Sequence, residues 1–80
     1  MFFVYSIRSL NENYIYVGLT DNFERRFKEH QSGKNKTTKP YKPFKILLVE
    51  HYPTRQEARN REKYLKSGIG KEFLKSILPV

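Results

Sequence analysis

The stretch YVGLTDNFERRFKEH, residues 16–30, places a strand-like aromatic run directly before an amphipathic helix. The run ends at Gly18, and the helix that follows carries Arg26 and His30 four residues apart on one side. Neither side chain is needed to fill a hydrophobic core. The rest of the chain must therefore explain an arginine and a histidine beside the end of a strand.

The same stretch predicts where this helix begins and ends. Asp21 followed three residues later by Glu24 is typical of a capping box, and Gly33 is a typical residue just after a helix. We expect a helix over about residues 22–32, with two phenylalanines four residues apart on its packed face.

Two strand-like segments surround the first turn: FFVYSIR, residues 2–8, and YIYVGL, residues 14–19. Together they predict an antiparallel hairpin. With a loop over residues 9–12, Tyr5 lies opposite Tyr16, and both tyrosines then share one face of the sheet. Simple cross-strand packing is the alternative interpretation of this pair.

A basic loop and a third strand follow the first helix. Residues 33–43, GKNKTTKPYKP, contain two prolines that oppose regular structure. Residues 44–52, FKILLVEHY, predict a strand whose apolar run indicates burial on both faces. We therefore expect this strand at the centre of the sheet.

The last part of the chain predicts two further helices. Thr54 and Glu57 form a second capping box, and that helix continues to about Gly68. Its inner stripe carries Glu62 among apolar residues, namely Ala58, Leu65 and Ile69. Residues 70–80, GKEFLKSILPV, predict a short third helix with four packing residues, Phe73, Leu74, Ile77 and Leu78.

Length and composition define the class of protein. Eighty residues make one small domain, residues 1–80, whose site must share side chains with its only core. The absence of cysteine excludes disulfides, a thiolate nucleophile and cysteine-ligated zinc, and it favours a cytoplasmic location. The first residues are apolar for only a short stretch and lack a basic leader, so we expect neither a signal peptide nor a membrane span.

The charge balance favours a polyanionic partner. Sixteen Lys and Arg residues against eight Asp and Glu give a formal charge of +8. A basic stretch could follow a phosphate backbone, with Tyr41 and Phe44 stacking on unpaired bases. A solvated loop that only aids solubility is the alternative. The candidate nucleic-acid-binding residues are Arg25, Lys34, Lys36, Lys39 and Lys42.

Glu62 is the strongest local anomaly, because a carboxylate on an inner helical stripe needs a cationic partner. It is either an edge residue paired with the region of Arg61 or with Lys66, or a ligand of a metal ion. Arg26 is either a surface arginine or a fork that holds a phosphate oxygen, and His30 is either an exposed helix residue or part of a site. With the paired tyrosines, these groups suit phosphodiester hydrolysis with one divalent cation.

Four segments resemble the GIY-YIG nuclease domain in order and spacing. They are FVY at 3–5, YVG at 16–18, NFERRFKEH at 22–30 and EARNREKYLK at 57–66, which together cover nearly the whole chain. The likeness is greatest to the small stand-alone members of that superfamily. It implies an α/β (α+β) fold: a three-stranded antiparallel sheet flanked by helices, in the order strand, strand, helix, strand, helix, helix.

The resemblance also implies roles for individual residues. Gly18 ends the second motif, where a side chain would crowd the cleft, while Glu62 matches the metal-binding glutamate. The implied catalytic residues are Tyr5, Tyr16, Arg26, His30 and Glu62. Phe3 replaces the glycine of the family name, and the polar residue that some larger members place after the glutamate has no match.

These features lead to one main hypothesis and two alternatives. We expect an endonuclease acting on nucleic acid, with DNA favoured, that is structure-selective or weakly sequence-specific and uses Mg²⁺ or Mn²⁺ on Glu62. Either tyrosine could be the general base. A tyrosine with a pKa of about 10 is mostly protonated at pH 7, so it would need a neighbouring group to remove its proton. His30 could aid the tyrosine or act as the base itself. A homodimer or a partner protein could supply specificity. The alternatives are an inactive binding module of the same fold and a basic RNA-binding protein.

Overall fold

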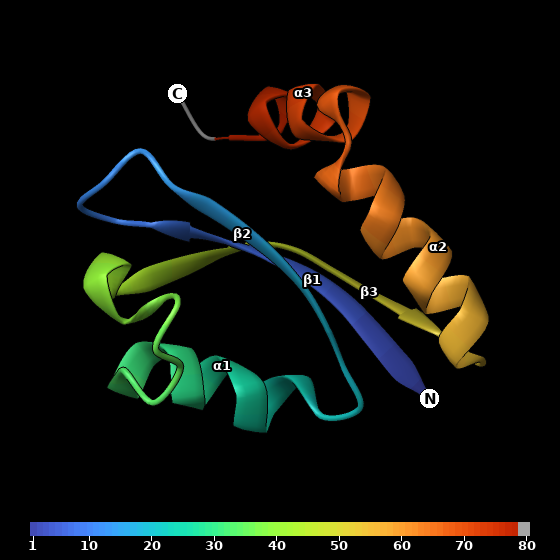
Figure 1. Ribbon diagram of the computed structural model, residues 1–80, viewed down its shortest axis with the longest axis horizontal. Helices are drawn as coiled ribbons and strands as arrows, with labels where there is room; N and C mark the ends of the chain where they lie inside the picture. Colours follow the sequence, from blue (N-terminus) through green and yellow to red (C-terminus); the bar gives the residue numbers. More distant parts are fainter. Residues whose placement is uncertain (79–80) are drawn as a thin grey trace.

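The computed structural model describes residues 1–78 and confirms the expected fold class and element order. Pro79 and Val80, the end of the expected third helix, lie outside the described residues. The elements in chain order are β1 (Phe2–Ser9), β2 (Ile15–Thr20), α1 (Phe23–Ser32), a 3₁₀ helix η1 (Lys39–Tyr41), β3 (Phe44–Tyr52), α2 (Arg55–Lys66) and α3 (Gly68–Ser76) (Figure 1).

The antiparallel sheet has the order β2-β1-β3, so the first strand is its centre. The expectation that residues 44–52 form the central strand is wrong. β3 pairs only with β1 and exposes Ile46 and Val49, whereas Val4, Tyr5 and Ile7 of β1 are fully buried. An apolar run alone does not distinguish an edge strand from a central strand, because both can be covered on one face by helices.

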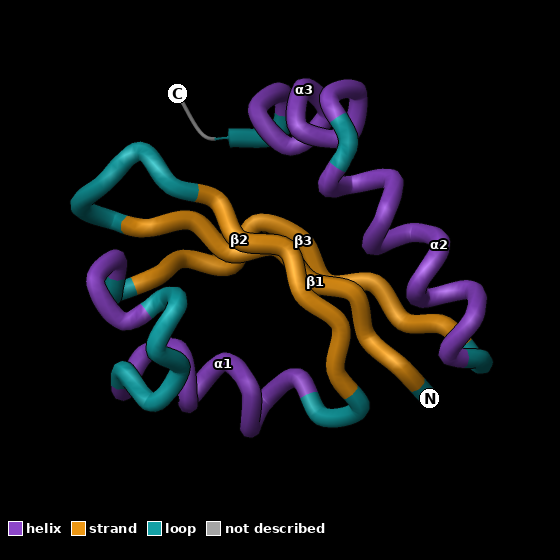
Figure 2. The backbone as a smooth tube through the Cα atoms, viewed as in Figure 1, coloured by secondary structure: helices purple, strands orange, loops and turns teal. Residues whose placement is uncertain are grey.

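Helices cover both faces of the sheet, with α1 on one face and α2 and α3 on the other (Figure 2). Two apolar clusters result. One lies beneath α2 and α3 and is built on Val4, Val17, Ala58, Leu65 and Leu74. The other faces α1 and is built on Tyr5, Ile7 and Phe44, with Tyr16, Phe23 and Phe27 packed against it. No helix among residues 1–78 combines the length and the apolar character needed to cross a membrane.

The hairpin register differs from the expected one by two residues. Tyr5 lies opposite Gly18, and Tyr16 lies opposite Ile7. The turn is longer than expected because the Ser9 hydroxyl accepts hydrogen bonds from the backbone N–H groups of the two residues that follow Leu10, at 3.2 and 3.0 Å. A two-residue shift keeps each side chain on its face, so the two tyrosine rings still lie 6.2 Å apart.

The first helix begins one residue later than its capping signal predicts. Asn22, not Asp21, is the N-cap, and its side-chain oxygen accepts the backbone N–H of Arg25 at 3.1 Å. Asp21 instead pairs with the side chain of Arg25 at 3.4 Å. The expected end at Gly33 is confirmed, since its φ of 82° is left-handed.

The second helix confirms its predicted cap, since the Thr54 hydroxyl accepts the backbone N–H of Glu57 at 3.3 Å. Its expected stripe holds only in part. Ala58 and Leu65 are buried, but Ile69 is 72% exposed. Ser67 ends α2 and caps α3, so Ile69 belongs to a helix of different direction. In α3 the expected packing is confirmed for Leu74, which is buried, whereas Phe73 and Ile77 are 36% and 37% exposed and Leu78 is half-buried.

Candidate active site

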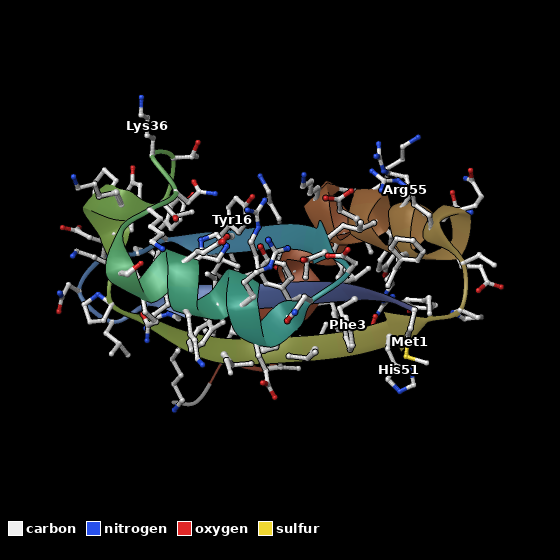
Figure 3. The ribbon with its side chains drawn as sticks, turned by 90° about the horizontal axis from the view of Figure 1, so that it is seen from below. Met1, Phe3, Tyr16, Lys36, His51 and Arg55 are labelled. Carbon is white, nitrogen blue, oxygen red and sulfur yellow. The ribbon has the colours of Figure 1, made fainter. Side chains whose placement is uncertain are left out.

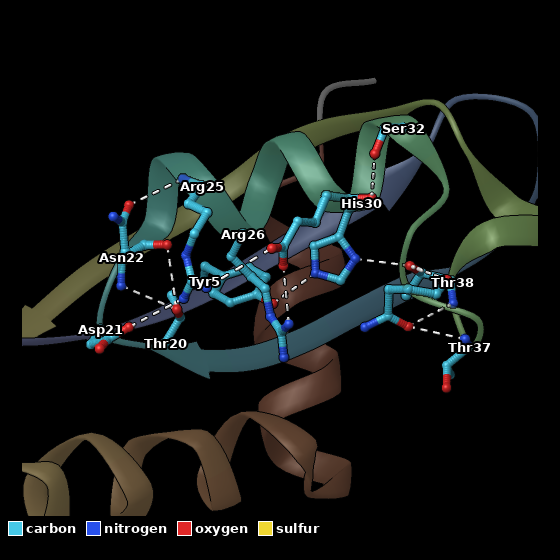
Figure 4. Close-up of polar contacts among 12 residues, drawn as sticks. Tyr5, Thr20, Asp21, Asn22, Arg25, Arg26, His30, Ser32, Thr37 and Thr38 are labelled. Atoms are coloured by element: carbon cyan, nitrogen blue, oxygen red, sulfur yellow. Dashed lines mark hydrogen bonds and ion pairs between the residues drawn. The ribbon is translucent and has the colours of Figure 1, made fainter.

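Tyr5 lies at the centre of the candidate site. It comes from the central strand β1 and is completely buried. Its hydroxyl oxygen lies 2.8 Å from Nε2 of His30, on α1 (Figure 4). A strand residue and a helix residue 25 positions apart therefore meet in one buried hydrogen bond.

Gly18 makes room for this tyrosine. The two residues are directly opposed in the β1–β2 ladder, and a Cβ atom at position 18 would lie 2.5 Å from the Tyr5 hydroxyl oxygen. Real Cβ contacts do not occur at that distance, so a side chain here would displace the tyrosine. The sequence predicted that a side chain at position 18 would crowd the cleft, and the structure identifies Tyr5 as the residue that it would crowd.

His30 is completely buried, which makes the interpretation as an exposed helix residue wrong. Its second ring nitrogen, Nδ1, lies 2.8 Å from the Thr38 hydroxyl oxygen (Figure 4). Burial lowers the pKa of His30, and the charge of Arg26 lowers it further, while Glu29 opposes the shift. The imidazole is therefore neutral at pH 7.

Arg26 lies beside the Tyr5 hydroxyl at the edge of the buried cluster. Its Nη1 pairs with Glu29 at 3.2 Å, and its buried Nε has no hydrogen-bond partner among residues 1–78. Burial raises the pKa of Tyr5, Tyr16 adds to the increase, Arg26 opposes it, and Glu62 adds to it. Tyr16 also packs against the Tyr5 ring, with ring centroids 6.2 Å apart, while Glu62 has the smallest influence on this phenol.

Glu62 projects from α2, and its side chain is 15% exposed. Its carboxylate pairs with Arg59 at 3.5 Å and with Lys66 at 3.4 Å. The expected pairing with Lys66 is thus confirmed, whereas Arg61 pairs with Glu50 at 2.8 Å instead. Both partners of Glu62 are about half exposed, so these pairs are weak and leave the carboxylate able to bind another cation.

The donor set suits one kind of metal ion. Among residues 1–78 there is no group of three His, Cys, Asp or Glu side chains that could form a protein cage for a metal. Mg²⁺ is commonly bound through one or two carboxylates, with water and substrate phosphate oxygens completing its shell. A single carboxylate, Glu62, fits Mg²⁺ or Mn²⁺ on this ground and does not fit zinc.

The basic loop reaches the site through two of its lysines. Lys34 and Lys36 line a hollow of about 360 Å³ together with Arg26, Glu29 and Asn35. Figure 3 shows Lys36 projecting at the same edge of the molecule as Tyr16. The other candidate binding residues are not brought to this hollow: Lys39 and Lys42 are exposed near Gly33, and Arg25 pairs with Asp21 and Glu29.

The expected stacking of bases on Phe44 is wrong, because this side chain is buried beside His30. Tyr41 has one ring face covered by Tyr14, with ring centroids 3.8 Å apart. The aromatic residues of the basic loop therefore stabilise the domain more than they offer free surfaces.

A second basic region was missed by sequence analysis. A groove of about 480 Å³ runs between the edge strand β2 and the helices α2 and α3, and Tyr16 lines it. Three lysines also line this groove: Lys66, Lys71 and Lys75. The i, i+4 spacing of the last two was a usable signal, but only the chain's tertiary fold places them beside the tyrosine.

A further hollow, of about 520 Å³, lies on the outer side of α1. Glu24 and Glu29 line it together with Arg25, and no site tyrosine does. Its mixed charge and its distance from the tyrosines make it unsuited to the chemistry, so we assign it no substrate.

Comparison with known proteins identifies the family. The model of the GIY-YIG catalytic domain matches residues 1–73. The chain belongs to the GIY-YIG family. Membership of this nuclease family agrees with the motif order, and the two motif tyrosines of the GIY-YIG chain, Tyr5 and Tyr16, stand on neighbouring strands.

Several relatives resemble this GIY-YIG domain over most of their length. UPF0213 protein CPE1444 of Clostridium perfringens is 36% identical over 67 residues, covering 82% of this chain and 71% of the relative. UPF0213 protein OB0043 of Oceanobacillus iheyensis is 34% identical, covering 94% and 87%. The solution NMR structure of UPF0213 protein BH0048 of Bacillus halodurans matches with a TM-score of 0.57 and 33% identity, over 96% of this chain and 85% of that one.

Proposed function

We propose that the protein is a divalent-metal-dependent endonuclease that hydrolyses phosphodiester bonds in DNA. The observation that carries the proposal is the arrangement of four side chains from three elements around the Tyr5 phenol: Tyr16 of β2, Arg26 and His30 of α1, and Glu62 of α2. A domain that only bound nucleic acid would need cations, but not a buried tyrosine–histidine pair beside a carboxylate.

Arg26 and Glu62 divide the handling of the scissile phosphate. The guanidinium of Arg26, with its unpartnered Nε, binds the phosphate and offsets the charge that develops in the transition state. Glu62 would hold a divalent cation, which would supply Lewis-acid stabilisation of the phosphate oxygens. Glu29 orients the guanidinium through its ion pair with Nη1 of Arg26.

Tyr5 is the better candidate of the two motif tyrosines for the general base, because its hydroxyl is bonded to a base, Nε2 of His30. Burial raises the pKa of Tyr5, so a standing phenolate is disfavoured. The phenol must therefore pass its proton to His30 as it accepts one from water. Tyr16 is half-buried and lines the lysine groove, so it contacts the substrate.

Access to Tyr5 requires a change when substrate binds. The tyrosine has no exposed surface, and Arg26 lies against its hydroxyl. A phosphate that draws the guanidinium toward the surface uncovers the phenol at the moment when the site is occupied. Binding of the phosphate is thereby coupled to activation of the water, and the phenol stays covered in the free enzyme.

The substrate crosses the β2 edge of the sheet. Lys34 and Lys36 lie on the side of α1, and the groove with Lys71 lies on the side of α3, with Tyr16 between them. Such lysines contact the sugar–phosphate backbone and carry no sequence information. Cleavage is therefore structure-selective or weakly sequence-specific, consistent with a role in DNA repair or recombination, and a second copy or a partner protein supplies any specificity.

One assay tests the function. Nicked, flapped, branched and single-stranded DNA and RNA are incubated with Mg²⁺ or Mn²⁺, in parallel with a chelator. We expect cleavage of DNA that the chelator abolishes, and Arg26→Ala to lower it by about a hundredfold, because one transition-state donor is lost. Arg55→Ala, exposed at the start of α2, is the matched control. Binding of all substrates without any cleavage would instead identify an inactive binding module.

The groove lysines make a separate prediction. Lys71→Glu should weaken DNA binding by about tenfold in the presence of chelator and reduce the salt dependence, because a phosphate contact is replaced by repulsion. Lys63→Glu makes the same charge change at an exposed position of α2 outside the groove and should have little effect. Fluorescence anisotropy over a range of salt concentrations measures both. Equal losses in the two variants would contradict the path across β2.

A further inference from the structure

The environment of His30 contains more than its bond to Tyr5. The imidazole lies between two hydroxyl groups, with Nε2 at 2.8 Å from the Tyr5 oxygen and Nδ1 at 2.8 Å from the Thr38 oxygen. The Thr38 hydroxyl in turn donates to the backbone carbonyl oxygen of Asn35 at 3.5 Å. A buried chain of three polar side chains thus ends on a backbone acceptor (Figure 4).

Proton counting distinguishes the two tautomers of the neutral ring. If Nδ1 carries the proton, it donates to Thr38, Thr38 donates to the Asn35 carbonyl, and Tyr5 donates to Nε2, so every proton has an acceptor. If Nε2 carries the proton, it points at the Tyr5 oxygen, and the phenolic proton has no acceptor among the hydrogen bonds of the described residues. A buried unpaired donor costs about 1–3 kcal/mol.

Arg26 adds an independent argument for the same tautomer. Its cationic guanidinium lies beside the Tyr5 oxygen. A positive charge there attracts the oxygen lone pairs and repels the phenolic proton, which is thereby directed to the opposite side, toward His30. The charge of Arg26 and the hydrogen-bond chain through Thr38 therefore both favour the Nδ1–H tautomer of His30.

We propose that Thr38 is a positioning residue that fixes His30 in the Nδ1–H tautomer, so that Nε2 accepts the proton of Tyr5 during catalysis. This inference rests on the proposed nuclease function. It also gives the basic loop a second role. Its lysines face the substrate, while its threonine holds the proton acceptor of the site from behind.

The proton transfer balances without a further reactant. The attacking water gives one proton to the Tyr5 oxygen, while the phenolic proton of Tyr5 moves to Nε2 of His30 and forms an imidazolium. The resulting hydroxide forms the new P–O bond, and the bond to the leaving oxygen breaks. The leaving oxygen takes a proton from solvent water, and the imidazolium returns its proton through Tyr5 to solvent, which restores the starting state.

Local structure keeps Thr38 in place. The side-chain oxygen of Asn35 accepts the backbone N–H groups of Thr37 and Thr38 at 3.0 and 3.3 Å, and the turn leads directly into η1. Thr38 is completely buried, whereas Thr37 is exposed. The pair therefore supplies a test variant and a matched control on adjacent residues.

The first test reads the tautomer directly and needs no activity. The chain has two histidines, and His51 is exposed, so two-bond ¹H–¹⁵N correlations separate the buried ring from an internal reference. We expect pyrrole-type Nδ1 and pyridine-type Nε2 in His30 of the wild type and of Thr38→Ser. In Thr38→Val the Nδ1–H group loses its acceptor while Arg26 and Tyr5 still favour that tautomer, so we expect signals of both tautomers in place of one. An Nε2–H ring in the wild type, or an unchanged tautomer in Thr38→Val, would overturn the proposal.

The second test uses single-turnover cleavage across pH. The charged and polar groups facing His30 are Arg26 and Glu29 on α1, Tyr5 on β1, Tyr16 on β2 and Thr38. We expect Thr38→Val to lower the rate by about 10- to 100-fold at saturating substrate, with Thr38→Ser close to wild type and Thr37→Val unchanged. In all active forms the rate should fall as acid protonates His30. A wild-type rate in Thr38→Val would contradict the inference.

The two readouts separate failure of the inference from failure of the proposed function. A wild type with the expected tautomer but no cleavage of any substrate would leave the position of the proton established and remove the nuclease assignment. Normal cleavage with the opposite tautomer would remove the role of Thr38 and leave the nuclease assignment intact.

Discussion

Glu62→Gln is expected to lower cleavage by about a thousandfold, equivalent to roughly 4 kcal/mol in transition-state stabilisation. Glutamine has nearly the same size and shape as glutamate but no charge, so the carboxylate that would hold the cation is lost while the packing of α2 is kept. The measurement is a single-turnover rate at several Mg²⁺ and Mn²⁺ concentrations. Excess metal should recover little of the rate, because a neutral amide is a poor ligand.

The controls for this variant address folding and binding. The two ion pairs of Glu62 are partly exposed, so their loss should change the free energy of unfolding by less than about 1 kcal/mol. DNA binding in chelator should be retained, because a negative charge has been removed near phosphate. Glu57→Gln, exposed on the same helix, should cleave normally. Wild-type cleavage by Glu62→Gln would exclude this carboxylate as the metal ligand.

A separate measurement follows the metal without catalysis. Mn²⁺ broadens the NMR signals of nearby nuclei, so titration should broaden the backbone signals around Glu62 in α2 of the wild type. The same titration of Glu62→Gln should leave these signals sharp. Equal broadening in both proteins would show that the cation is held by other groups.

Gly18→Ala is expected to affect stability and activity together. The added Cβ would lie 2.5 Å from the Tyr5 hydroxyl oxygen and 2.6 Å from Cζ, and the ring is held by its buried bond to His30. The tyrosine must move, which we expect to cost about 1–3 kcal/mol in the free energy of unfolding. A displacement of about 1 Å at a reacting group lowers rates by about a hundredfold. Chemical denaturation and single-turnover cleavage measure the two effects.

Gly68→Ala is the matched control, because a Cβ at that position meets no atom within 4 Å. It lies in the first turn of α3, where alanine is a better helix former than glycine, so stability should be unchanged or slightly higher. Cleavage should equal that of the wild type. Loss of activity in Gly18→Ala at full stability would still support displacement of Tyr5, whereas an unaltered rate would show that Tyr5 tolerates movement and is not the base.

Local sequence determined much of the architecture. Period-two and helical patterns, the Thr54 cap and the left-handed Gly33 predicted elements whose bounds agree to within a few residues. These signals depend on interactions between residues close in the chain, so the sequence contains them directly. Two wrong expectations had different origins. The hairpin register depended on a local turn, whose backbone N–H groups donate to the Ser9 hydroxyl. The order of strands depended on long-range pairing, because β1 pairs with both other strands.

The residue types of the candidate site were likewise readable from the sequence, through the order and spacing of the motifs. The sequence alone did not determine that Tyr5 rather than Tyr16 is bonded to His30, or that Thr38 faces the buried imidazole. Those contacts join residues from different strands, a helix and a loop. Their geometry exists only after the sheet has set β1 against β2 and packed α1 across that face, because hydrogen bonds form over about 3 Å and no local pattern encodes such distances.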